Sequence, residues 1–492
     1  MSSVAWLVLV PLLASAAAYW PIVRNYFHAD DFIHLYMIGD GRLGEFLLTP
    51  HGGHLLVVRN AIFVLHHALF GADPRGYLWC ALLTHLVNVA LLFVVVRAAT
   101  DSPRLACVGA TLWGVSPLHA DPLGWYSVYG EVILTTALLV VLRWLLRAQA
   151  RAASDGRHGA LAAGLLLLGA LSFGIGIGLA MAMAVAAALL LPGTAHRAAR
   201  RWFLALALAV PLLYVAARLG YALVASHAYA SPATNLGARA LLVDVPLMTA
   251  DMLAYGTAAA ATGAFAAPPP ARALLVLGFA LLAGLAAAAA TAPPLARRRI
   301  AALLVLAIGG YGIIALGRAP ALGAFGMTPA EGAAWARYHY ASTSLLTVAL
   351  ALALGGVRVP ARLANVATTA ILAFTALALW LVPRPIDHYD EERATVARIF
   401  ELVAARAAAP VNGTAYIHNR ALYPLGYVVD RHYFPGWAGV LIALSPNDTA
   451  DGVPVRFVEA DAAVVAEARA RPGTRTADLL LTREEYRAAV GQ

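Results

Sequence analysis

Long apolar segments recur along the first 380 residues of the chain, and short stretches rich in Arg or in other polar residues separate them. Such runs predict transmembrane helices, because a helix needs about 20 apolar residues to cross about 30 Å of hydrocarbon. We expect eleven of these helices, at residues 4–22, 77–97, 105–122, 128–147, 159–173, 175–192, 202–225, 272–291, 300–317, 340–356 and 363–382.

The composition agrees with a polytopic α-helical membrane protein. The chain is 61% hydrophobic and 12% charged, with a mean hydropathy of +0.73, which lies outside the range of ordinary soluble domains. The net charge of +9 is divided unevenly, because residues 1–382 hold 23 Arg against 12 acidic residues, whereas residues 383–492 hold 12 Arg against 14. We therefore assign the basic excess to membrane topology and expect no nucleic-acid partner.

The arginines fall in clusters that predict the orientation of the helices. With eleven spans all clusters lie on one side, which the positive-inside rule makes cytoplasmic, here the cytoplasmic side of a bacterial inner membrane. The segments 23–76, 226–271 and 318–339 and the tail 383–492 are then extracytoplasmic. The clusters are Arg97 and Arg104; Arg143, Arg147, Arg151 and Arg157; Arg197, Arg200 and Arg201; Arg297, Arg298 and Arg299; and Arg358 and Arg362.

One apolar segment, residues 236–266, fits this scheme poorly. It is long enough for a helix, but its Asp244 and Asp251 are costly in lipid. We expect it to form an interfacial or re-entrant pair on the extracytoplasmic side.

The tail follows a different pattern from the membrane domain, residues 1–382. Residues 413–419, 453–460 and 477–482 read as strands, and helical periodicity lies before, between and after them, at 390–409, 461–470 and 483–490. The sequence therefore predicts a small C-terminal α/β domain over residues 383–492, which we expect to recognise an acceptor or cover a cleft.

Two adjacent carboxylates, Asp30 and Asp31 in "FHADDFIHLY", follow the first span closely. One explanation is structural, since either aspartate can cap the helix that follows. A second is catalytic, with one carboxylate as a general base whose pKa is set by burial and by its neighbour. A third is a divalent metal site, because in a helix His28 would face Asp31 and Asp30 would face His34.

Further polar groups are expected at the same membrane edge, in "TPHGGHLLVVRN", "SPLHADPLGWYSVYGE" and "GRAPALGAFGMTPAEGAAWARYHYAS". Acids for proton transfer, arginines for bidentate phosphate binding and aromatic rings for sugar or lipid contact are what transfer from an anionic lipid carrier requires. The chain has no Lys, so the candidates for phosphate binding are Arg59, Arg318, Arg337 and Tyr338. The candidates for substrate contact or a second acid are His54, His119, Asp121 and Glu131.

Over residues 4–380, and best over the first 140, these motifs resemble the GT-C class of glycosyltransferases, including protein O-mannosyltransferases and the lipid A aminoarabinose transferase. The resemblance implies a polyprenyl-phosphate-linked sugar donor and a catalytic base in the first external loop. By position, Asp30 matches the leading acid and Asp31 the second, and Asp121 lies where relatives often have another acid. Arg337 and Tyr338 match a late arginine-tyrosine element that contacts the donor phosphate.

We therefore expect a membrane glycosyltransferase that transfers a sugar to an extracytoplasmic glycan, lipid or protein. The alternatives are a transporter or flippase of a lipid-linked substrate, and a polysaccharide polymerase on an unrelated helical scaffold. A transporter typically shows internal repeats and charges in the middle of the membrane, whereas the polar motifs here gather at one edge.

Overall fold

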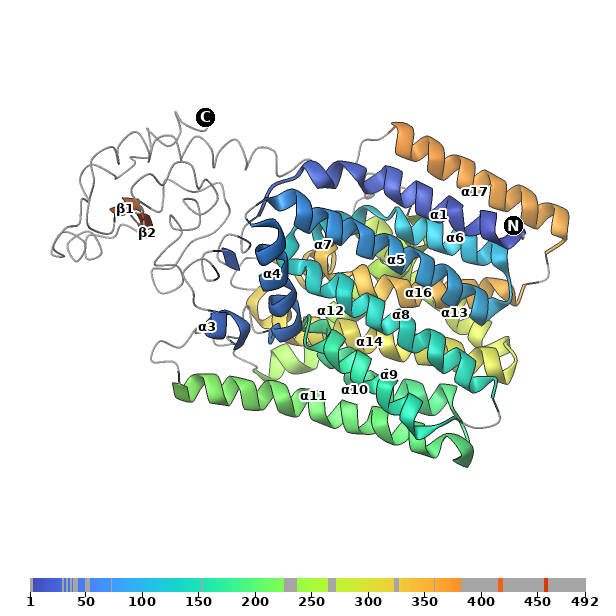
Figure 1. The fold of residues 1–492 in the computed structure, drawn as a ribbon. Helices are drawn as coiled ribbons and strands as arrows, with labels where there is room; N and C mark the ends of the chain where they lie inside the picture. Colours follow the sequence, from blue (N-terminus) through green and yellow to red (C-terminus); the bar gives the residue numbers. More distant parts are fainter. Residues whose placement is uncertain are drawn as a thin grey trace.

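The computed structural model describes residues 3–28, 43–48, 54–71, 73–151, 154–224, 237–263, 271–322, 327–357, 359–381, 415–418 and 455–458, together with Asp31, His34, Leu35 and Ile38. Within these residues the first 381 positions form a bundle of α-helices (Figure 1). The helices are α1 (Ser3–Tyr19), α3 (Leu43–Leu48), α4 (Val57–Phe70), α5 (Pro74–Thr100), α6 (Pro103–Gly114), α7 (Ala120–Gly124), α8 (Tyr129–Gln149), α9 (Gly156–Ala170), α10 (Ile175–Leu190), α11 (Arg197–Val224), α12 (Val245–Thr262), α13 (Ala271–Thr291), α14 (Pro294–Leu322), α15 (Pro329–Ala333), α16 (Tyr340–Gly355) and α17 (Ala361–Leu381).

Short helical turns join several of these helices. A π-helical turn, Ala240–Asp244, leads into α12. The 3₁₀ turns are Trp20–Arg24, Pro117–His119, Tyr126–Val128, Thr194–His196 and Ala336–Tyr338.

Each of the eleven expected membrane segments contains a helix. Among the described residues, seven helical segments are long and apolar enough to cross a membrane. They are Trp6–Arg24, Pro74–Thr100, Tyr126–Gln149, Thr194–Ala217, Arg272–Thr291, Pro294–Pro320 and Ala361–Leu381. The segments in α6, α9, α10 and α16 are shorter; α9, for instance, has 15 residues, or about 22 Å at 1.5 Å per residue. The polytopic helical fold is thus confirmed, and eleven full spans stay a prediction.

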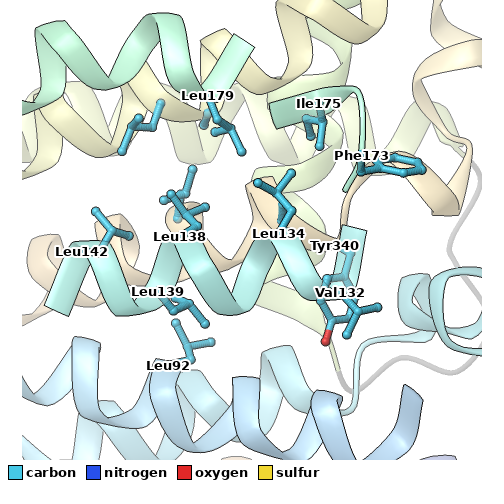
Figure 2. Packing of buried hydrophobic residues seen from close by; sticks show 14 of the residues in the cluster. Leu92, Val132, Leu134, Leu138, Leu139, Leu142, Phe173, Ile175, Leu179 and Tyr340 are labelled. Carbon is cyan, nitrogen blue, oxygen red and sulfur yellow. The ribbon is translucent and has the colours of Figure 1, made fainter. Parts of the chain in front are cut away.

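Helix α8 lies inside the bundle and packs on two sides (Figure 2). Its Leu134 and Leu138, one helical turn apart, point toward Ile175 and Leu179 of α10, and on the opposite face Leu139 points toward α5. All five of these side chains are almost fully buried. Since one helix buries two faces, its sequence is apolar nearly all round, as hydropathy alone indicates.

Residues 238–262 form one continuous helical segment. The paired segments that we expected are therefore wrong, and an interfacial placement stays a prediction. Met248 and Met252 are fully buried, and the segment packs on α13, α14 and α16. Its contacts run from Gly332 in α15 to Leu112 near the end of α6. A single helix satisfies its backbone groups internally, whereas a turn in apolar surroundings would leave some of them unpaired, which explains the difference.

The connectivity of the helices gives the bundle two distinct ends. The start of α1 lies at one end, together with the Arg-bearing loops after α5, α8, α10, α13 and α16, and α3 and α4 lie at the other (Figure 1). Cross-links support this grouping, because Arg299 donates to Gln149 Oε1 and to the carbonyl of Ala99, both at 2.8 Å. The turns around residues 115–128 and 171–174 therefore lie at the end opposite to the arginines.

In the tail, β1 (Ala415–His418) and β2 (Val455–Val458) pair in parallel, with Ala415 opposite Val455. Both strands fall inside segments predicted as strands. Parallel pairing needs a crossover connection, typically a helix, which agrees with an α/β arrangement. The third predicted strand and the three predicted helices lie outside the described residues, so the domain itself stays a prediction.

Candidate functional site

The Asp31 carboxylate is fully buried and accepts three hydrogen bonds from the protein. Its Oδ2 accepts from the backbone N–H of His28 at 3.0 Å, three residues earlier, as the acid of a capping box does. Its Oδ1 accepts from the backbone N–H of Ser127 at 2.6 Å and from Ser127 Oγ at 2.5 Å. Asp31 is therefore not the N-cap that we considered, because its side chain accepts from a residue before it in the chain; its bonds to Ser127 join the first external segment to the turn before α8.

A buried polar network extends from this contact. Ser127 Oγ lies 3.0 Å from His34 Nδ1, and Arg59 Nη1 lies 3.2 Å from the same nitrogen. Arg59, in α4, is only 1% exposed. The Arg59 guanidinium therefore lies beside His34, and the aliphatic stem of Arg59 lies against Gly130 at the start of α8. Replacing the glycine hydrogen with a methyl group would crowd both the Arg59 stem and the carbonyl of Ser172.

Burial raises the pKa of the Asp31 carboxyl from 3.8 to about 6, although the hydrogen bonds from His28 and Ser127 lower it. Desolvation penalises the ionised form, whereas the donors stabilise it. A carboxyl with this pKa is ionised for the most part at pH 7 and becomes protonated in mildly acidic solution.

The same turn contacts the late arginine. The Arg337 guanidinium lies over the rings of Trp335, Tyr338 and Trp125, at 4.8, 5.2 and 5.5 Å from their centroids. Trp125 also packs edge-on against His28, with 5.2 Å between the ring centroids. Trp125 is therefore shared between the segment that carries Asp31 and the segment that carries Arg337. The Trp125–Val128 turn brings the two together, whereas the sequence predicted only that they lie at the same membrane edge.

Two other predicted residues, Arg318 and Tyr338, lie beside these groups. Arg318, at the end of α14, stacks over the Tyr338 ring at 5.9 Å. Tyr338 is buried, and its hydroxyl has no hydrogen-bond partner among the described residues. The ring of His54 stacks on Phe173, with 5.4 Å between the centroids.

Two predicted site residues lie in the packed interior. His119 is fully buried between the rings of Trp113 and Tyr340, at 4.6 and 4.5 Å between centroids. Glu131 is also fully buried, and its Oε1 accepts from the backbone N–H of Ala341 at 3.1 Å. A carboxylate at the start of α16 satisfies an otherwise unpaired amide and interacts favourably with the helix dipole. These positions favour structural roles for both residues.

Asp121 lies in the first turn of α7 and is half-buried. Asp30, the leading acid, lies outside the described residues. The described part of the chain contains no group of three or more His, Cys, Asp or Glu side chains that could hold a metal. Of the proposed ligands, Asp31 accepts from Ser127, and the Nδ1 of His34 faces the positive charge of Arg59.

Ser127 is the contact that the sequence did not predict. A serine between Tyr126 and Val128 carries no signal of its own, and its role appears only when the turn meets Asp31. The sequence predicted Arg337 at this membrane edge, but it did not predict that the Trp125 ring stacks on the Arg337 guanidinium.

Comparison with known proteins supports the fold. The sequence matches no protein-family model and no curated protein. The structure is similar to the crystal structure of ArnT from Cupriavidus metallidurans bound to undecaprenyl phosphate, with a TM-score of 0.52 over 95% of this chain and 91% of that chain, at 14% identity. The fold is GT-C-like. The oligosaccharyltransferase of Archaeoglobus fulgidus, tethered to an acceptor peptide, shows a TM-score of 0.45 over 84% of this chain and 61% of that chain, also at 14% identity. The similarity to ArnT confirms the GT-C resemblance for the fold.

Proposed function

We propose that this protein is a membrane glycosyltransferase that transfers a hexose or pentose from a polyprenyl-phosphate donor to a glycan, lipid or protein acceptor. The observation that carries the proposal is the turn Trp125–Val128. Its Ser127 donates hydrogen bonds to the Asp31 carboxylate, and the ring of its Trp125 stacks on the Arg337 guanidinium. An acidic segment and a phosphate-binding cation thus meet at one end of a GT-C-like bundle.

The donor in this reaction is already activated, because phosphate is its leaving group. An acceptor hydroxyl or amine attacks the anomeric carbon, the bond from that carbon to the phosphate oxygen breaks, and the electron pair leaves with polyprenyl phosphate. The acceptor's proton goes to a carboxylate, and a cation stabilises the charge that develops on the phosphate.

Asp30 is assigned as the base and Asp31 as a positioning residue. Both oxygens of Asp31 already accept hydrogen bonds from the protein, so its geometry suits holding the segment in place. The assignment of Asp30 rests on its place next to this anchor and on the GT-C resemblance.

Arg337 is assigned to the donor phosphate, assisted by Tyr338 and Arg318. Aromatic rings stack on the face of a guanidinium, whereas its N–H donors lie in its plane, so stacking and bidentate phosphate binding are compatible. The undecaprenyl phosphate bound by the structurally similar ArnT supports this class of donor.

The site is assigned to the extracytoplasmic side of a bacterial inner membrane. The Arg clusters at the opposite end of the bundle support this orientation, since positively charged loops stay in the cytoplasm. Domain boundaries at 1–382 and 383–492, and a role of the tail in acceptor binding, are part of the same proposal.

The test is to incubate membranes that contain the protein with a panel of radiolabelled polyprenyl-phosphate sugars, with and without a chelator. We expect label from one donor to appear in an acceptor fraction, with polyprenyl phosphate released in equal amount. Arg337→Ala should weaken use of that donor about 10- to 100-fold, from the loss of charge-assisted bonds. Arg75→Ala, which removes an exposed arginine paired with Asp73 at the same end, is the matched control. Donor that crosses the membrane with its sugar still attached would instead favour a flippase.

A further inference from the structure

A cavity of about 380 Å³ lies at the end of the bundle opposite to the candidate site. It opens beside the last turns of α8, where the predicted span ends. One part of its wall is apolar and the other is basic. Its lining residues are Leu91, Val140, Trp144, Arg143, Arg147, Arg151 and His158.

The basic wall is formed by three arginines at the end of α8. Arg143 and Arg147 are four residues apart in the helix, so their side chains project from the same face, and Arg151 follows just after the last helical residue, Gln149. The positive charges of Arg147 and Arg97 both repel the charge of Arg143. Like charges this close repel one another, and a bound anion would relieve the repulsion.

The described part of the chain supplies no counter-ion for this cluster. No ion pair joins an acid to Arg143, Arg147 or Arg151 there, and the buried Nε of Arg143 has no hydrogen-bond partner. Asp155, nearby in sequence, accepts from the backbone N–H of Arg157 and lies 3.2 Å from His158 Nδ1. Asp155 therefore pairs with His158, which lines the cavity, and not with the three arginines.

The apolar wall identifies the source of the anion. Leu91 and Val140 come from the membrane-spanning parts of α5 and α8, and Val140 is 37% exposed. Trp144 lines the same cavity, and tryptophans are enriched at the boundary between hydrocarbon and head groups. A free anion would gain nothing from this wall, whereas a phospholipid would cover it with an acyl chain. The positive-inside rule explains basic residues at this end but not a cavity shared with aliphatic side chains.

We propose that this cavity binds an anionic phospholipid, with the head-group phosphate on Arg143, Arg147 and Arg151 and an acyl chain along Leu91 and Val140. Guanidinium groups bind phosphate oxygens through paired, charge-assisted hydrogen bonds. The site is separate from Asp31 and Arg337 and does not depend on the proposed reaction.

The test is native mass spectrometry of the full-length protein in detergent with equimolar phosphatidylglycerol and phosphatidylcholine. We expect phosphatidylglycerol to be retained preferentially. Arg147→Gln and Arg151→Gln should each lower its affinity about 5-fold, the effect of one arginine on anionic lipid. Arg157→Gln removes an exposed arginine outside the cavity and should change nothing. Equal retention of the two lipids, or an equal loss in Arg157→Gln, would overturn the proposal.

Two further measurements address the cavity itself. Val140→Trp keeps every charge but fills the apolar wall, so it should release the lipid, and wild-type retention would contradict the site. Inorganic phosphate should not displace phosphatidylglycerol at equal concentration. Complete displacement would show that the cavity selects a free anion and would refute the lipid assignment.

Discussion

Replacing Ser127 with Ala should make sugar transfer more sensitive to acid. The change removes the hydroxyl that donates to Asp31 Oδ1 at 2.5 Å and leaves the backbone donors of Ser127 and His28 in place. These donors lower the pKa of the Asp31 carboxyl, which burial raises to about 6. With one donor fewer, the ionised form is less stable and the pKa rises.

The size of the shift follows from the energy of the lost contact. A hydrogen bond to a charged group contributes about 1.5 kcal/mol or more, and one pKa unit corresponds to about 1.4 kcal/mol. We therefore expect the pKa of Asp31 to move from about 6 to about 7. If only the ionised form holds the acidic segment in place, activity at pH 6 falls about 5-fold relative to wild type, and activity at pH 7 falls about 2-fold. Above pH about 8 the two proteins should be nearly equal.

The assay is the rate of transfer from the preferred polyprenyl-phosphate sugar between pH 5 and 9, in proteoliposomes. Ser127→Thr keeps a hydroxyl and should restore the wild-type profile. Ser344→Ala removes another buried serine, whose Oγ donates to the carbonyl of Ala341 within α16, and controls for general destabilisation. An acid limb in Ser127→Ala that coincides with that of the wild type would refute the link between Ser127 and the ionisation of Asp31.

Three other substitutions test the surrounding structure. Gly130→Ala should lower the thermal unfolding midpoint and the activity, because the added methyl group meets the Ser172 carbonyl and the Arg59 stem at a cost of about 1–3 kcal/mol; an unchanged midpoint would argue against this packing. Tyr311→Phe removes the hydroxyl that donates a hydrogen bond to the buried Nδ1 of His339 at 2.9 Å. Thermal unfolding should therefore show a loss of stability of about 1–3 kcal/mol, and the folded fraction should keep the wild-type KM for the sugar donor. Arg337→Lys keeps the charge but loses planar stacking and bidentate binding, so the KM for the donor should rise about 10-fold; an unchanged KM would remove Arg337 from the donor site.

Much of the membrane fold could be predicted because hydropathy accumulates over long segments. Every expected span contains a helix, and the Arg clusters gather at one end. Helix ends inside apolar sequence could not be predicted as well. The break at Ser116–Pro117 interrupts a run that hydropathy reads as one helix, 105–122, and the packing of α12 depends on neighbours far away in the sequence.

The candidate site was predicted in part for a related reason. Sidedness places the acidic segment, the turn before α8 and the Arg337 segment at the same end, whatever their detailed packing. Depth within the bundle is a tertiary property, so Glu131 and His119 were expected at the substrate but lie in the interior. Ser127 was missed for the same reason, because its partner is 96 residues away.

The central claim is that a carboxylate beside the Asp31 anchor accepts the acceptor's proton. It is tested most directly by comparing sugar transfer by wild type, Asp30→Asn and the control Asp73→Asn, which alters an exposed aspartate near the same end, in proteoliposomes with matched protein content. The account predicts that Asp30→Asn lowers the transfer rate by about 10²- to 10⁴-fold while donor binding persists, and that Asp73→Asn transfers sugar at the wild-type rate. Transfer by Asp30→Asn at the wild-type rate would contradict it.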